Sequence, residues 1–282
     1  KYIKFLNFIN KNNKLYCYIN RLFIFGEKNM KVLIIYYLIT IALCSIILYI
    51  CHKKIKKEYT KELVLKIITL STVFLHYSDV WVSYLTTGDP DFGKSHMFAI
   101  YPCHIMMWIS LIFAFLAKKD SKLGHILADF MFYIGFFCGT IGIVVNDSYL
   151  ATPDLGDYEV LKGLLSHSTL LLGCLYVFVM KYVKVNAFRN LCSAVVGFLA
   201  FIVDGVFIIN LFKLFDVEEV NAMYLLEPPF ENLPFINTAT IGIAGVIAVF
   251  GLATLLEYFF LPKEQRWINR LSKKGESKCT NF

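Results

Sequence analysis

Two pairs of neighbouring residues have side chains suited to acyl transfer. Cys103 and His104 stand near the start of one apolar run, and His167 and Ser168 stand near the start of another. An imidazole can take the proton of a thiol, and the thiolate can then attack an acyl carbonyl. We therefore interpret Cys103 as a candidate nucleophile and His167 as its base, with hydroxyls such as that of Ser168 as oxyanion donors.

Each of these residues also has a plainer interpretation. A cysteine in an apolar helix is usually a small hydrophobic side chain. His104 can equally hydrogen-bond a neighbouring helix. A histidine such as His167 inside an otherwise apolar run is rare, however, because ionisable groups are costly in lipid and usually have a function.

Further polar residues are predicted to support this pair. His76 and Asp79 are three residues apart, and hence on one helix face, where the carboxylate could orient an imidazole or simply join two helices. Asn210 lies near the corresponding end of another run. The spacing of the histidines and acids demands no metal, so we predict neither a metal site nor another cofactor.

The elements that carry these residues are long apolar runs, which predict membrane-spanning helices. The 282 residues are 57% hydrophobic and 17% charged, against about 45–50% and about 25% in soluble domains. A span needs roughly 20 apolar residues, and only a helix satisfies its own amides in lipid. We expect an all-α, multi-pass bundle of about seven spans: 31–51, 63–86, 97–117, 123–146, 160–181, 187–213 and 236–262.

In this arrangement the candidate residues share one layer. Cys103 and His167 each lie about seven residues into their spans, or roughly 10 Å at 1.5 Å per residue. His125 and Asp129, four apart near the opposite end, indicate either a structural pair or a proton path. The role of Asp204, near the middle of a span, stays open. Gly135 and Gly139 form a GxxxG pair that indicates close helix contact, or a chance spacing.

The distribution of positive charge predicts the orientation. Lys and Arg gather in the connections 52–62, 118–122 and 182–186 and in the tail 263–282. The connections 87–96, 147–159 and 214–235 hold a single Lys and many acidic residues. The positive side is cytoplasmic, so we predict a cytoplasmic C-terminus and an outside or lumenal N-terminus. The net charge of +7 is thereby explained without nucleic acid, which we exclude as a partner.

We predict three parts of the chain: residues 1–29, the membrane domain 30–262, and the basic cytoplasmic tail 263–282. The lysines of 1–29 conflict with an outside location, and Met30 stands directly before the first span. We therefore expect either that 1–29 precedes the natural start or is a weakly ordered tail, or that it forms an interfacial amphipathic helix. The eight cysteines are dispersed and indicate no disulfide framework.

The sequence also resembles a known family at these positions. Tyr101-Pro102-Cys103-His104-Ile105 is similar to the signature of the YwaF-like integral membrane proteins, and is closest to their animal branch of seven-span ether-phospholipid acyltransferases. His167, within Leu165–Leu170, and the stretch Asn221–Leu226 followed by Pro228-Pro229 match as well. The resemblance covers roughly residues 31–262. It implies transfer of a polyunsaturated acyl chain to a lyso ether-phosphatidylethanolamine without coenzyme A, with the acyl thioester on Cys103 and His167 as base.

Three functions remain open at this point. The first is the acyltransferase, with phospholipid and lysophospholipid substrates and an endomembrane location in a eukaryote or the plasma membrane in a bacterium. The second is a lipid or fatty-acid ester hydrolase, in which water is the acceptor. The third is a seven-span transporter or receptor that uses buried His and Asp residues, which the lack of Gly- or Pro-broken span pairs disfavours.

Overall fold

The computed structural model describes residues 27–90, 93, 98–144, 155–215, 220–229 and 234–271 of the 282-residue chain. Within these ranges all regular structure is helical. The elements are α3 (Glu27–Lys54), α4 (Glu58–His76), α5 (Ser78–Thr87), α7 (Pro102–Phe115), α8 (Lys122–Val144), α10 (Tyr158–Val179), α11 (Ala187–Leu214), η1 (Ala222–Tyr224), α12 (Thr238–Phe260) and η2 (Lys263–Gln265). Of the predicted tail 1–29, residues 1–26 lie outside the described residues. The last three belong to α3, which also includes Met30.

The helices confirm a multi-pass membrane bundle. Five of them, α3, α8, α10, α11 and α12, are long and apolar enough to cross a membrane individually. The pair α4 and α5 meets the same test as one span bent by 45°. The remaining predicted span, 97–117, corresponds to α7, an apolar helix of only 14 residues. The orientation relative to the cytoplasm stays a prediction.

Two spans differ from the predicted boundaries for local reasons. The residue before a proline is disfavoured in the helical region, and Tyr101 is extended, with φ −115° and ψ 155°. The helix predicted over 97–117 therefore begins at Pro102, a residue well suited to the first helical position. The helix predicted over 63–86 breaks at Tyr77, which has φ −93° and ψ 10°. The span predicted as continuous over 63–86 is therefore bent, and the expected lack of Gly- or Pro-broken spans did not reveal this bend because neither residue lies at it.

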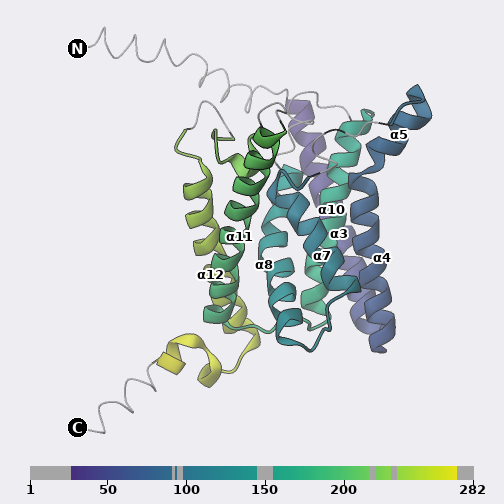
Figure 1. The fold of residues 1–282 in the computed structure, drawn as a ribbon. Helices are drawn as coiled ribbons and strands as arrows, with labels where there is room; N and C mark the ends of the chain where they lie inside the picture. Colours follow the sequence, from purple (N-terminus) through teal and green to yellow (C-terminus); the bar gives the residue numbers. More distant parts are fainter. Residues whose placement is uncertain are drawn as a thin grey trace, which may run out of the picture.

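Four helices form a closed ring at the centre of the bundle: α4 packs on α7, α7 on α8, α8 on α10, and α10 on α4 (Figure 1). Outside this ring, α3 packs on α10, while α11 packs on both α8 and α12. Consecutive ring helices alternate in direction. The end of α4, the start of α7, the end of α8 and the start of α10 therefore lie at the same end of the bundle, near α5 in Figure 1.

Glycines of α8 make the contact with α10 close. A Cβ added to Gly139 would lie 3.1 Å from the backbone of Leu171, and one added to Gly135 would lie 2.4 Å from the sulfur of Cys174. Both glycines are buried, as are most side chains around them. The GxxxG pair thus has the structural role that its spacing predicts, because small residues let two helix backbones approach.

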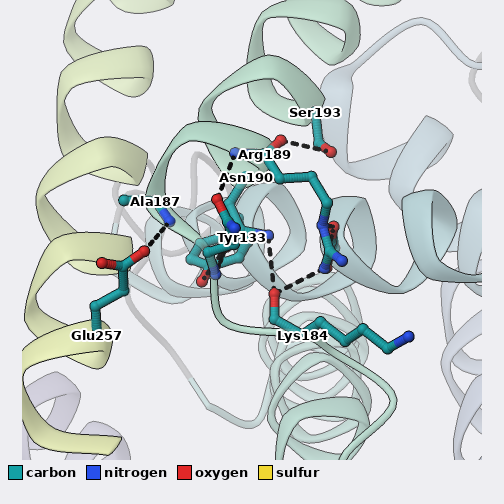
Figure 2. A network of polar contacts seen from close by, with 9 residues as sticks. Tyr133, Lys184, Ala187, Arg189, Asn190, Ser193 and Glu257 are labelled. Atoms are coloured by element: carbon teal, nitrogen blue, oxygen red, sulfur yellow. Dashed lines mark hydrogen bonds and ion pairs between the residues drawn. The ribbon is translucent and has the colours of Figure 1, made fainter. Parts of the chain in front are cut away.

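The opposite end of the bundle is held by a buried polar network (Figure 2). The guanidinium of Arg189 in α11 donates to both carboxylate oxygens of Asp129 in α8, at 3.0 and 2.9 Å. Tyr133 donates its hydroxyl to the side chain of Asn190 at 3.1 Å. Of the two interpretations of Asp129, a structural pair or a proton path, the structural one agrees with these bonds. Its partner, however, is Arg189 rather than His125.

Glu257 of α12 belongs to the same end of the molecule and joins three segments. Its carboxylate accepts the backbone N–H of Ala187 and of Trp267, each at 2.6 Å, and a guanidinium N–H of Arg270 at 2.9 Å. The side chain is only 1% exposed. This one carboxylate therefore attaches the start of α11 and the segment after η2 to the end of α12.

We predict that Glu257→Gln lowers the free energy of unfolding by about 1.5–3 kcal/mol, the size expected for lost hydrogen bonds to a charged group. Glu264→Gln is the matched control, because Glu264 is exposed in η2 and should change stability by less than about 0.5 kcal/mol. Thermal unfolding of the two purified variants in detergent provides the measurement. Equal midpoints for both variants would contradict the role assigned to Glu257.

Candidate functional site

Cys103 and His104 lie in the first turn of α7, one of the four helices of the ring. Cys103 is partly buried and packs against the main hydrophobic core, whereas His104 is buried, with 4% of its surface exposed. Cys138 of α8 packs against the same core, and Cys174 of α10 is part of it. The candidate thiol therefore faces the inside of the ring rather than lipid.

His76 and His104 come together, as the predicted layer requires. Their ring centroids are 4.4 Å apart, although they come from α4 and α7. His76 is the last residue of α4, and His104 lies in the first turn of α7, so both stand at the same end of the ring. Tyr101 lies edge-on to His104 at 5.3 Å and near Tyr224 at 5.5 Å, so an aromatic group covers the histidine pair.

His167 occupies the wall of the ring formed by α10 and α8. Its Nδ1 lies 2.8 Å from the carbonyl oxygen of Gly163. A carbonyl only accepts, so Nδ1 carries the proton and Nε2 of the neutral ring keeps a lone pair. The ring fills the space beside Gly142 of α8: a Cβ there would lie 2.3 Å from Nε2. Nε2 is therefore the atom available for proton transfer, and it faces α8.

Asp79 forms an ion pair that sequence reasoning missed. Its carboxylate accepts from Nζ of Lys162 at 2.7 Å, and Lys162 also lies 2.8 Å from Glu159. The side chains of Asp79 and Lys162 are 12% and 13% exposed. The signal in the sequence was a lysine inside the predicted span 160–181, five residues before His167. This pair fixes α5 to the start of α10.

Ser168 and Asn210 are placed differently from their predicted roles. The hydroxyl of Ser168 donates to the carbonyl of Leu164 at 2.7 Å and lies 3.0 Å from the hydroxyl of Tyr36 in α3. The amide of Asn210 is exposed on α11 and donates to the carbonyl of Val206 at 2.7 Å. Ser168 thus joins α10 to α3, and Asn210 lies outside the group of histidines.

The ring thus collects a thiol and three imidazoles at one end, but no hydrogen bond joins Cys103 to His167 in the described part of the chain. Their pairing stays a prediction. Across the described ranges, no group of three or more His, Cys, Asp or Glu residues is arranged to hold a metal ion. Thiols and imidazoles are suited to nucleophilic attack and proton transfer.

Comparison with known proteins identifies the family. The sequence profile of the TMEM164 family matches residues 24–261, which include every helix of the ring and all of the candidate residues. The chain belongs to the TMEM164 family. No curated protein and no solved structure matches it. Membership in the TMEM164 family agrees with a multi-pass membrane protein, and the match ends close to the end of α12.

We predict that Lys162→Met destabilises the protein by about 3 kcal/mol, because it leaves the nearly buried carboxylate of Asp79 without its ion pair. Adding Asp79→Asn should recover part of this loss. A double-mutant cycle of unfolding free energies measures the coupling between the two residues. If the two single effects simply added, the ion pair would not be the device that fixes α5 to α10.

Proposed function

We propose that this TMEM164-family chain is a membrane acyltransferase that moves an acyl chain between phospholipids through a thioester on Cys103, with His167 as the base. The observation that carries the proposal is that Cys103, packed against the core, and His167 lie on two helices of the same four-helix ring and at the same end of it. The resemblance of Tyr101–Ile105 to the signature of ether-phospholipid acyltransferases supports the substrate class, and the preferred acceptor is a lyso ether-phosphatidylethanolamine.

The first half-reaction loads the cysteine. The Sγ proton of Cys103 passes to Nε2 of His167, and the thiolate forms a C–S bond with the ester carbonyl of a phospholipid. The ester C–O bond breaks, and the departing alkoxide takes the proton from the imidazolium. The products are an acyl thioester on Cys103 and a lysophospholipid.

The second half-reaction regenerates the enzyme. The hydroxyl of another lysophospholipid gives its proton to His167, and its oxygen attacks the thioester carbonyl. The C–S bond breaks, and the sulfur of Cys103 takes back the proton. Because a thioester is already activated, no coenzyme A is required. Exclusion of water from the ring would favour the lipid hydroxyl as acceptor over hydrolysis.

The proposal requires Cys103 and His167 to approach when a lipid is bound. Catalytic hydrogen bonds are often long in ligand-free structures and tighten in the complex with substrate. The two residues lie on α7 and α10. These helices pack little against each other, but both pack on α8. A small movement of the short helix α7 against α8 would change their separation without opening the ring.

We predict that Cys103→Ala reduces acyl transfer by roughly 10³-fold or more, the scale seen when the nucleophile of a catalytic set is removed. Cys192→Ala should keep full activity, because Cys192 is exposed on α11 outside the ring. The assay follows a labelled acyl chain from diacyl phosphatidylcholine to added lyso ether-phosphatidylethanolamine in vesicles containing the purified protein. Unchanged transfer by Cys103→Ala would reject the nucleophile.

The same assay separates the two other functions. Release of free fatty acid that does not depend on added lysolipid would identify a hydrolase instead. A transporter is favoured by one specific observation, the break between α4 and α5, because interrupted spans line many transport sites. In that case neither lipid product would form, and the thiol of Cys103 would be dispensable.

A further inference from the structure

A cavity with a mixed polar and apolar lining opens at the end of the bundle that carries the candidate site. It has a volume of about 280 Å³ and is lined by residues 224–228, which begin at the last residue of η1, and by residues 237–239 at the start of α12. An apolar groove of about 380 Å³ lies beside it between α11 and α12, lined by side chains from 195–202 and 238–247. Thr238 and Ala239 line both, so the cavity and the groove are neighbours at the start of α12.

The dimensions of the groove fit one leaflet of a membrane. Its lining runs from Thr238 to Ile247 along α12, which is about 14 Å at 1.5 Å per residue. The hydrocarbon core of a bilayer is about 30 Å thick, so the groove covers about half of it. A cavity with polar side chains at the start of α12, beside an apolar groove of one-leaflet depth, fits a lipid with its headgroup in the cavity and one acyl chain in the groove.

The backbone beside the cavity is held in a strained conformation. Met223 and Tyr224 have φ of 53° and 55°, in the left-handed region that side chains other than glycine rarely adopt. Neighbouring groups enforce it: the N–H of Met223 donates to the carbonyl of Ile100 at 2.8 Å, and the hydroxyl of Thr238 donates to the carbonyl of Tyr224 at 2.6 Å. Strain that the surroundings enforce in this way is concentrated at ligand sites.

The charge at the mouth of the cavity selects the headgroup. Asn221 fixes the backbone of Glu227, accepting its N–H at 3.2 Å and donating to its carbonyl at 2.9 Å. The carboxylate of Glu227 itself is exposed, and within the described residues it takes part in no hydrogen bond or ion pair. A solvated carboxylate on a backbone held in this way attracts a cation, and among lipid headgroups that cation is an ammonium.

We propose that the cavity and the groove bind one phospholipid or lysophospholipid whose headgroup carries an ammonium, with the headgroup at Glu227 and one acyl chain between α11 and α12. The proposal deepens the acyltransferase function and rests on it for the meaning of the bound lipid. A chain of aromatic contacts connects the site to the candidate catalytic residues. Tyr224 lines the cavity, and its ring centroid lies 5.5 Å from that of Tyr101. The ring centroid of Tyr101 lies 5.3 Å from that of His104.

Photolabelling of the full-length Cys103→Ala protein tests the site without any acyl transfer. The probe is lysophosphatidylethanolamine with a diazirine in its acyl chain, in dodecyl maltoside micelles, and labelled peptides are identified by mass spectrometry. We expect saturable labelling within 195–202 and 238–247. Helix α3 is the internal reference, because it exposes Ile34, Ile35 and Leu38 to lipid and should label weakly and without saturation.

Gly242→Phe should abolish the groove labelling and Gly251→Phe should not. An added Cβ meets nothing within 4 Å at either glycine, so both positions have open space at the backbone, but only position 242 lies in the groove. Position 251 is about 14 Å further along α12. Labelling that survives Gly242→Phe, or that spreads evenly over α3 and the other lipid-facing helices, would overturn the proposal.

Glu227→Gln tests the headgroup. The preference of the groove for lysophosphatidylethanolamine over the corresponding lysophosphatidylglycerol probe should fall by up to about fivefold, the size expected for an exposed ion pair. An unchanged preference would overturn the headgroup assignment. Because Cys103→Ala cannot form a thioester, the binding result is separate from the transfer assay: saturable labelling with no transfer by the wild type would keep the site and reject the enzyme.

Discussion

The close contact between α8 and α10 is the interaction on which the rest of the bundle depends. In lipid there is no hydrophobic force between helices, so their association relies on packing and on polar contacts. Gly139 lets α8 meet the backbone of Leu171, and one turn along α8 Gly142 leaves room for the ring of His167. The same contact therefore holds the ring together and determines where its imidazole lies.

The polar residues of the spans follow from the same constraint, because a polar group in lipid must find its partner inside the protein. They divide into two layers. At one end, Asp129, Arg189 and Glu257 form bonds that attach α11, α12 and the following segment to the ring, and their geometry is fully explained by structure. At the other end, the ion pair of Asp79 with Lys162 joins α5 to α10, and the proposed catalytic pair of Cys103 and His167 belongs to the same end.

Much of this arrangement could be predicted from the sequence, since long apolar runs predict helices and Gly135 and Gly139 predict a close contact. The predicted layer was also correct in bringing His76 and His104 to one end of the bundle. The break at Tyr77 was missed because no Gly or Pro lies there, and the break is only visible in how α4 and α5 pack. The start of α7 could have been found, because Pro102 disfavours helix in the residue before it.

Partner choice among polar residues was the part that the sequence could not provide. His76 and Asp79 are three residues apart and would share a face in a continuous helix, but the bend lies between them, and Asp79 pairs with Lys162 of α10. His125 and Asp129 are similarly spaced, and Asp129 pairs instead with Arg189. Such contacts join elements far apart in the chain, so spacing along one helix does not determine them.

The central claim is that Cys103 carries an acyl group during turnover. The most direct measurement is peptide mass spectrometry of the protein after incubation with a donor phospholipid and no acceptor. The account predicts one acyl chain attached to Cys103, removed by neutral hydroxylamine as a thioester is, and absent from Cys103→Ala. Acyl transfer that proceeds with Cys103 unmodified throughout would contradict it.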